Sequence, residues 1–76
     1  MLCHLDLVVT DRPDVPARVL ATLARRQGAI VSLAFARGRD DGAAALALAI
    51  DVEDRHRRLL IERIATLVDV WEVDAR

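Results

Sequence analysis

Few residues in this chain have the types and spacing that catalysis or metal binding requires. Cys3 is the only cysteine, so there is no intramolecular disulfide and no thiolate cage for a metal. A small buried hydrophobe is the usual role of such a residue. His4 and His56 have no second histidine or carboxylate at metal-ligand spacing, and no nucleophile is accompanied by a base. We therefore expect no catalytic residue, no metal ligand and no cofactor bound by this chain.

The polar residues with the most functional potential lie in one short turn, Asp11-Arg12-Pro13-Asp14. This turn separates a stretch of alternating apolar residues, 2–10, from a stretch of helical period, 15–27. Asp14 is well placed to cap the helix, because its carboxylate can accept hydrogen bonds from amides two or three residues on. Gly28 is expected to end the helix in a left-handed conformation. An apolar, partly β-branched strand is expected over residues 29–37.

The second half of the chain predicts a hairpin, a helix and a last strand. Asp41-Gly42 is a strong turn signal within the loop 38–42. Residues 43–52 alternate between large aliphatic side chains on one face and Ala45, Ala47 and Ala49 on the other. Asp54 is expected to cap a helix that runs to about residue 67. The inward residues of this helix are expected to be Leu60, Ile61, Ile64, Leu67 and Val68. The last strand covers residues 70–74, where Trp71 shares the parity of Val73 and is expected in the core.

The element order β-α-β-β-α-β predicts an α+β fold of the ferredoxin-like type. Right-handed crossovers give a four-stranded antiparallel sheet with both helices on one face. We expect residues 1–76 to form one domain. A chain of this size buries only ~60–65% of the surface that its unfolded form exposes, so self-association would help its stability.

Composition excludes several functions that this architecture can host. The net charge is −1 and all 11 basic residues are arginine, which gives no bulk attraction for nucleic acid and no lysine for Schiff-base or P-loop chemistry. The alanines of the open sheet face cannot stack RNA bases. The first loop lacks the cysteines of metallochaperones, and Arg12 and Arg18 have no glycine-rich anion cradle beside them. No apolar run is long enough to span a membrane, so a cytoplasmic protein is expected.

The chain resembles the ACT domain, a small-molecule-sensing module of amino-acid metabolism, over nearly its whole length. The resemblance is carried by the segment from Asp11-Arg12-Pro13-Asp14 through Leu20, by Arg25-Arg26-Gln27-Gly28, and by Ile30-Val31-Ser32-Leu33. Arg-x-Gly followed by Ile-x-Ser-Leu, and later Leu67-Val68-Asp69-Val70, are most similar to the short regulatory (small) subunit of acetolactate synthase.

The resemblance implies a regulatory role without catalysis. Such subunits form a homodimer by edge-to-edge pairing of ACT domains, and they bind and activate the thiamine-diphosphate-dependent catalytic large subunit in branched-chain amino-acid biosynthesis. In many members valine binds between the first loop and helix of one protomer and the second strand of the other. That implies a small amino-acid effector near Asp11, Asp14, Val15, Ala29 and Ile30. A helix N-terminus suits a ligand carboxylate because its first amides are free.

Three positions depart from the pattern of valine-sensing members. Those members usually carry Asn at the position of Asp11, Gly at that of Asp14 and Asn at that of Ala29. Two carboxylates facing an incoming carboxylate are repulsive in a partly desolvated pocket, and Ala29 removes an amide that could hold the ligand. We therefore expect weak or absent valine feedback. The alternatives are a free-standing ACT sensor or interaction module that takes another effector or enzyme, and a small catalytic protein of the same fold.

Several further residues have a structural and a functional interpretation. Val31, Leu33 and Phe35 are assigned to a dimer interface or core surface, because an exposed apolar edge strand invites pairing. Ala17 and Ala21 could let two helices approach closely, or they could serve only as good helix formers. The cluster Arg55-His56-Arg57-Arg58 is interpreted mainly as a solvated helix face, with a docking patch as the alternative. For Trp71, contact with a catalytic subunit is the alternative to the core. The flat, nearly uncharged face of Ala45, Ala47 and Ala49 suggests a covering partner.

Overall fold

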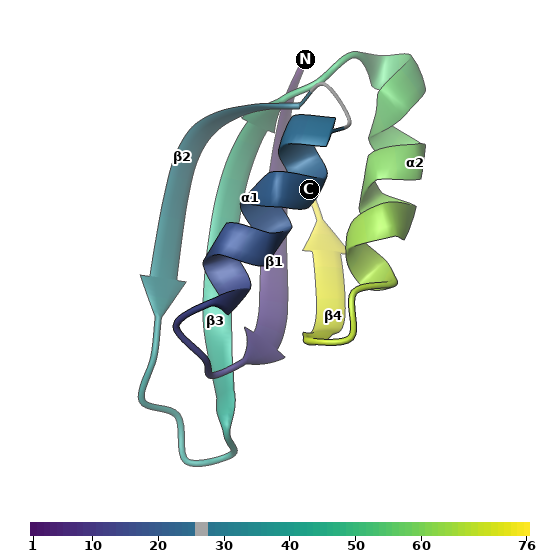
Figure 1. Ribbon diagram of the computed structural model, residues 1–76. Coiled ribbons are helices and arrows are strands. Elements are labelled where there is room, and N and C mark those ends of the chain that lie inside the picture. The colour runs from purple at the N-terminus through teal and green to yellow at the C-terminus, as the bar shows by residue number, and fades with distance from the viewer. Residues whose placement is uncertain (26–27) are drawn as a thin grey trace.

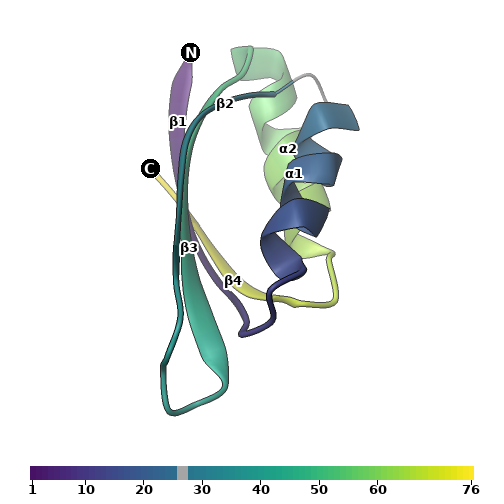
Figure 2. The ribbon, with the colours of Figure 1, turned by 60° about the vertical axis from the view of Figure 1, so that its left-hand side comes forward.

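The computed structural model describes residues 1–25 and 28–76, and its elements follow the order β-α-β-β-α-β. They are β1 (Leu2–Thr10), α1 (Val15–Arg25), β2 (Ala29–Ala36), β3 (Ala43–Asp51), α2 (Asp54–Ala65) and β4 (Val70–Ala75). The four strands form one antiparallel sheet in the order β2-β3-β1-β4. Both helices lie on the same face of this sheet (Figure 1; Figure 2). The predicted ferredoxin-like fold is confirmed.

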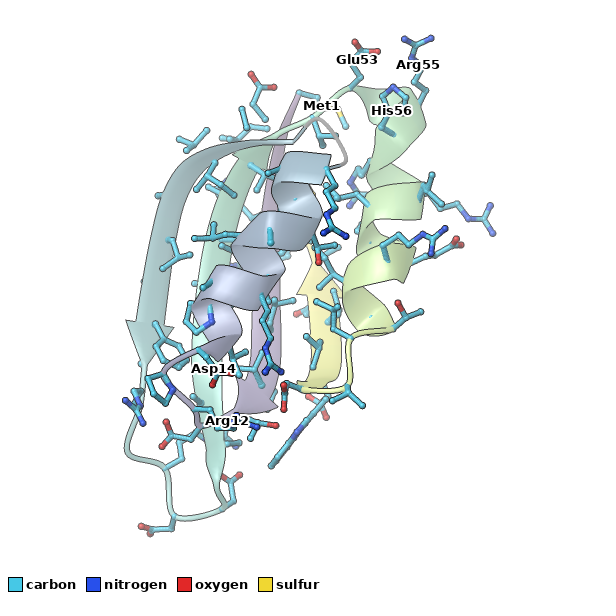
Figure 3. The ribbon with its side chains drawn as sticks, in the orientation of Figure 1. Met1, Arg12, Asp14, Glu53, Arg55 and His56 are labelled. Atoms are coloured by element: carbon cyan, nitrogen blue, oxygen red, sulfur yellow. The ribbon has the colours of Figure 1, made fainter. Side chains whose placement is uncertain are left out.

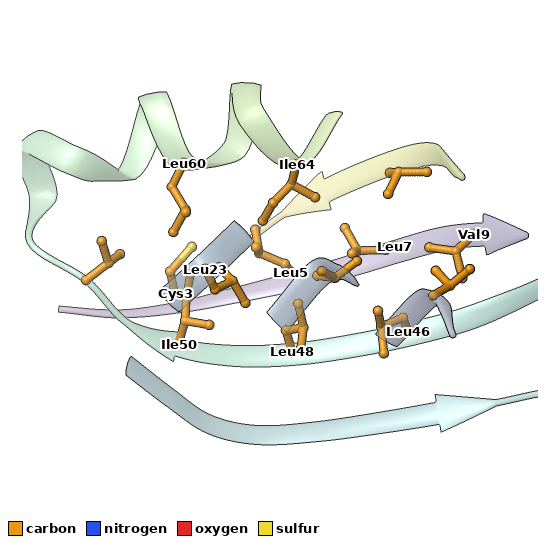
Figure 4. Packing of buried hydrophobic residues seen from close by; sticks show 14 of the residues in the cluster. Cys3, Leu5, Leu7, Val9, Leu23, Leu46, Leu48, Ile50, Leu60 and Ile64 are labelled. Atoms are coloured by element: carbon orange, nitrogen blue, oxygen red, sulfur yellow. The ribbon is translucent and has the colours of Figure 1, made fainter. Parts of the chain in front are cut away.

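The core lies between the sheet and the helices and is aliphatic (Figure 4). Alternate residues of β1 and β3 point into it, since Leu5 pairs with Leu48 and Leu7 with Leu46 across the two central strands. The helices contribute the buried side chains Val15, Val19, Leu23, Leu60 and Ile64. Among the described residues, no polar or charged side chain is buried. Neither helix of that part of the chain is long and apolar enough to cross a membrane.

The ends of the helices differ from the sequence expectations. Glu53, not Asp54, is the N-cap residue of α2, and it makes no side-chain capping hydrogen bond within the described residues. The helix ends at Ala65, and the Thr66 hydroxyl donates to the carbonyl oxygen of Arg63 at 2.7 Å. Val68 is therefore past the helix and 90% exposed, so its predicted inward position is wrong. For α1, the expected last residues Arg26 and Gln27 lie outside the described part of the chain.

The left-handed glycines are those of the hairpin. Gly38 has φ 95° and Gly42 has φ 76°, which fits the expected turn between β2 and β3. Gly28 does not share this conformation, so the predicted left-handed cap is wrong at that position. Its amide still donates to the carbonyl oxygen of Leu23 at 3.2 Å and closes the end of α1.

Trp71 lies in a β-bulge and not in the core. Val8 pairs with Glu72 while the next residue, Val9, pairs with Val70, so Trp71 is the extra residue on β4. An extra residue breaks the alternation of side chains between the two faces of a strand. Trp71 and Val73 are two residues apart, but they therefore do not point to the same face. The indole is 51% exposed, and its Nε1 donates to the Thr10 hydroxyl at 3.1 Å.

Candidate functional site

The charged turn between β1 and α1 is held in place by backbone hydrogen bonds on two sides. The Thr10 amide donates to the carbonyl oxygen of Asp69 at 2.8 Å, which ties the turn to the segment before β4. The Asp11 amide donates to the carbonyl oxygen of Gly42 at 3.0 Å, which ties it to the hairpin. The turn therefore lies at one end of the sheet, where three connections of the chain meet (Figure 1).

Each carboxylate of this turn is paired with a guanidinium group. Asp11 Oδ1 lies 2.6 Å from Arg37 Nε. Asp14 contacts Arg12 Nε at 3.2 Å and Arg18 Nη2 at 2.9 Å, and Figure 3 shows Arg12 and Asp14 together at the start of α1. Arg18 also reaches across to Asp69, with Nη1 2.8 Å from Oδ2. The cluster holds as many cations as anions: Arg12, Arg18 and Arg37 with Asp11, Asp14 and Asp69.

These pairs change two expectations about the turn. Among the described residues, the Asp14 carboxylate bonds guanidinium groups and no helix amide, so the predicted N-cap is not formed. Arg12, two residues before Asp14, and Arg18, four residues after it, take this carboxylate instead. Asp11 and Asp14 also do not present two unpaired negative charges to a ligand. The simple repulsion inferred from the sequence is therefore largely cancelled within the cluster.

The five residues of the predicted effector site lie at opposite ends of the molecule. Asp11, Asp14 and Val15 follow Thr10, which pairs with Ala43 at the hairpin end of β3. Ala29 instead pairs with Asp51, which pairs with Leu2 at the other end of the sheet. With a rise of about 3.3 Å per residue, the two ends of β1 are roughly 25 Å apart. One chain does not bring these residues together, and whether they form a site stays a prediction that requires a second chain.

Strand β2 is an apolar strand at the edge of the sheet. Ile30 is 39%, Val31 61% and Leu33 38% exposed, while Phe35 is partly buried against the core. Ile30 pairs with Ile50 and Ser32 with Ala49, so Val31 is the extra residue of a second bulge. A bulge interrupts the outward row of backbone groups. The regular part of this edge is therefore the segment 32–36.

Ala17 and Ala21, the helical residues of the predicted dimer interface, lie on a different surface from β2. Both are exposed, and on a helix they are roughly opposite the buried Val19. Arg18 and Leu20 lie about 100° to either side of Val19. Because Arg18 reaches Asp69 beside β4, Leu20 is on the flank toward β2. Sequence reasoning missed Leu20 as the helix residue next to the edge, although its partial burial fits that position.

The face of the sheet away from the helices is apolar on one half and charged on the other, where the Asp6 carboxylate is paired with Arg76. Ala45 and Ala47 of β3 are exposed there, which agrees with the expected flat alanine surface. Ala49 is nearly covered. On the other half Asp6 lies directly opposite Asp74. The expectation of a nearly uncharged face is therefore correct only for the half formed by β2 and β3.

The Arg55–Arg58 cluster is largely paired with neighbours on its own helix. Arg55 Nε lies 2.8 Å from Glu53 Oε2, and Arg58 Nε lies 3.3 Å from Glu62 Oε1. Such pairs fit the solvated helix face. In the part of the chain that the structure describes, no three His, Cys, Asp or Glu side chains are grouped so that they could hold a metal ion.

Sequence comparison identifies no relative of this chain: no protein-family model matches it, and no curated protein sequence matches it. Solved structures do match. The ACT domain of GTP pyrophosphokinase from Chlorobium tepidum has a TM-score of 0.80 at 16% identity, with 100% of this chain and 97% of that chain covered.

The small subunit of acetolactate synthase from Thermotoga maritima has a TM-score of 0.84 at 21% identity, covering 99% of this chain and 47% of that one. A homoserine dehydrogenase from Thiobacillus denitrificans has a TM-score of 0.79 at 21% identity, covering 97% and 16%. The chain thus spans less than half of each of these two proteins. At such identities the likeness is one of fold, and the chain has the fold of the ACT domains that it matches.

Proposed function

We propose that this chain is a regulatory, non-catalytic module that binds and activates the catalytic subunit of acetolactate synthase. Two observations support this proposal. The backbone is similar to that of an acetolactate synthase small subunit, with a TM-score of 0.84. The sequence also carries the short motifs of that group, Arg-x-Gly at residues 26–28 and Ile-x-Ser-Leu at residues 30–33. The thiamine diphosphate cofactor belongs to the catalytic subunit, and this chain binds none.

The observation that carries the regulatory proposal is the uncovered apolar edge strand β2. We propose that two copies pair there as antiparallel strands and form a continuous eight-stranded sheet, with branched and aliphatic side chains of both copies buried at the edge. Because Val31 interrupts the row of backbone groups, the pairing uses the segment 32–36 and is centred near Ala34. Leu20 of each α1 then faces the partner across the edge, whereas Ala17 and Ala21 stay on the outer helical surface.

This register also explains how an effector site is completed. Pairing centred on Ala34 sets Ile30 of the partner subunit opposite Gly38, one residue beyond the Arg37 that holds Asp11. The turn of one copy and the start of β2 from the other thus meet, as the proposed effector residues require. A valine carboxylate entering there competes with the ion pairs of Asp11 and Asp14 for the same arginines. We therefore propose weak or absent valine feedback.

The test is acetolactate formation by the host's catalytic subunit, measured with and without this chain and then with added valine. Stimulation that valine leaves unchanged is the expected result. Stimulation that valine abolishes would keep the regulatory role and contradict the account of the turn. Absence of stimulation would contradict the role itself and favour a free-standing ACT sensor. The likeness to the ACT domain of GTP pyrophosphokinase, which covers 97% of that chain, supports this second candidate.

A further inference from the structure

The face of the sheet opposite the helices is uncovered in one chain and stays uncovered in the proposed dimer. Both helices lie on the other side of the sheet (Figure 2), and pairing along β2 extends the sheet without covering this face. Two hollows lie on it, one of about 790 Å³ over β1, β3 and β4 and one of about 150 Å³ over β1, β2 and β3. The open face is therefore accessible to a partner protein.

Trp71 reaches this open face because of its bulge. Its Nε1 donates to the Thr10 hydroxyl at 3.1 Å, and Thr10 lies on the face of β1 opposite to that of the buried Val9. The indole is thus fixed beside the start of β4 with half of its surface exposed. A side chain that is already held in one position loses little freedom on binding, and tryptophan is enriched among the residues that contribute most to binding energy at interfaces.

Three carboxylates gather on the open face next to this indole. Asp6 lies directly opposite Asp74, and Glu72 lies opposite Val8, the next outward residue of β1. Like charges directly opposite each other in a sheet are destabilising. Asp6 has a partner in Arg76, with Oδ2 2.6 Å from Nη2, whereas Glu72 and Asp74 form no ion pair within the described residues. Two exposed carboxylates therefore remain unpaired beside the indole.

The other half of the open face is flat and apolar. Ala45 and Ala47 are exposed on β3, and Ala36 and Ala34 lie beside them on β2. Side chains this small let another segment of chain lie close against the sheet. Exposed apolar surface that is bordered by polar residues is typical of a protein–protein interaction site.

A second copy of the chain does not fit this face. Stacking two copies about a two-fold axis along the strands would set the carboxylates of one over the alanines of the other, which buries charge without a partner. An axis across the strands would set the carboxylates of the two copies against each other, and like charges repel. Charge complementarity instead requires cationic side chains on the occupant.

We propose that the open face receives the catalytic subunit, through a segment that carries arginine side chains between small apolar ones. This inference rests on the proposed function, which supplies the partner. Guanidinium groups can stack on the indole of Trp71 and form charge-assisted hydrogen bonds with Glu72 and Asp74. The apolar residues of the same segment then cover Ala45 and Ala47. Arginine fits better than lysine, because its planar group both stacks and binds carboxylates in two places.

The test is the affinity of the full chain for the host's catalytic subunit of acetolactate synthase, measured by calorimetric titration at several salt concentrations. The double variant Glu72→Gln with Asp74→Asn removes both unpaired charges and keeps the shape of the side chains. Its Kd should be about tenfold or more higher, and should depend less on salt than that of the unchanged chain. Because the repulsion between Asp6 and Asp74 is also removed, its free energy of unfolding should not fall.

A matched control separates the open face from the overall charge. Asp54→Asn with Glu62→Gln on α2 makes the same change in net charge on the side of the helices, and should bind as the unchanged chain does. Trp71→Ala keeps every charge and should raise the Kd about tenfold or more. Thermal unfolding shows whether each variant is folded.

The outcomes distinguish this inference from the proposed function. A Kd that neither Trp71→Ala nor the double variant changes would overturn the assignment of the open face and leave the regulatory role intact. Equal losses in the double variant and its control would also overturn it, since net charge alone would then explain them. So would unchanged binding with stronger self-association of the double variant, because the carboxylates would then only keep the β4 edge from pairing. No binding by the unchanged chain would overturn both the proposed function and this inference.

Discussion

The edge strand β2 gives the sharpest prediction, because it can be altered where the fold depends on it least. Val31 is 61% exposed and is the extra residue of a bulge, so it contributes little to the core of one chain. In the proposed dimer Val31 lies directly beside the paired segment 32–36, where the partner covers its side chain although its backbone takes no part in the pairing. Val31→Asp should therefore leave the monomer folded and weaken its self-association.

The size of the effect follows from the exposed fractions. Full burial of a Val, Leu or Ile side chain contributes about 1.5–3 kcal/mol. Burial of the exposed fractions of Ile30, Val31 and Leu33 then contributes about 2–4 kcal/mol per protomer. Val31 alone accounts for about 1–2 kcal/mol, or about 2–4 kcal/mol for the two copies of a symmetric dimer. This corresponds to a Kd that is roughly 30- to 700-fold higher, and the cost of desolvating two carboxylates adds to it.

Sedimentation equilibrium over a range of concentrations measures this change directly. Leu59→Asp is the matched control, because Leu59 is 45% exposed on α2, away from the edge strand. The control should dimerise as the unchanged chain does. A dimer whose Kd is the same for both substitutions would refute the reasoning, as would an unchanged chain that stays monomeric at every concentration.

Two further predictions concern the loops. Gly42→Ala should lower the free energy of unfolding by about 1–2 kcal/mol, because φ is 76° and an added Cβ meets no atom within 4 Å that could compensate or clash. Gly28→Ala should have a free energy of unfolding within about 1 kcal/mol of the unchanged chain, since its Cβ meets only ordinary contacts. Urea unfolding measures both, and equal losses for the two variants would contradict this prediction. The hydrogen bond from the Ala43 amide and the charge of Arg39 lower the pKa of Asp41 from its ordinary value of 3.8. The contribution of Asp41 to stability is therefore present above about pH 4 and is lost as the pH falls through the lowered pKa. Asp41→Asn should flatten the dependence of the free energy of unfolding on pH below pH 4, and an unchanged dependence would contradict this prediction.

Local patterns determined the elements and most of the core. The alternation of β1 and β3 and the spacing of Val15, Val19 and Leu23 are periodic within each segment, and each period is set by the backbone geometry of a strand or a helix. The residues that these periods place on one side are buried in the core. The hairpin was equally local, because Gly42 supplies the positive φ that its turn requires. The order of the elements then left few ways to build a sheet, which is why the fold was predictable.

Tertiary contacts decided the remainder. The periodicity of β4 could not reveal that Trp71 is displaced, since the bulge depends on the register against β1. The sequence shows Asp14 near arginines, but only the packing of α1 against the segment before β4 brings Arg18 to Asp69 and leaves an apolar pocket below the pair. Ala29 and Asp11 lie at opposite ends of the sheet for the same reason. Periodicity fixes which way a side chain faces within its own element, whereas a site depends on distances between elements, and these are set only when the elements pack.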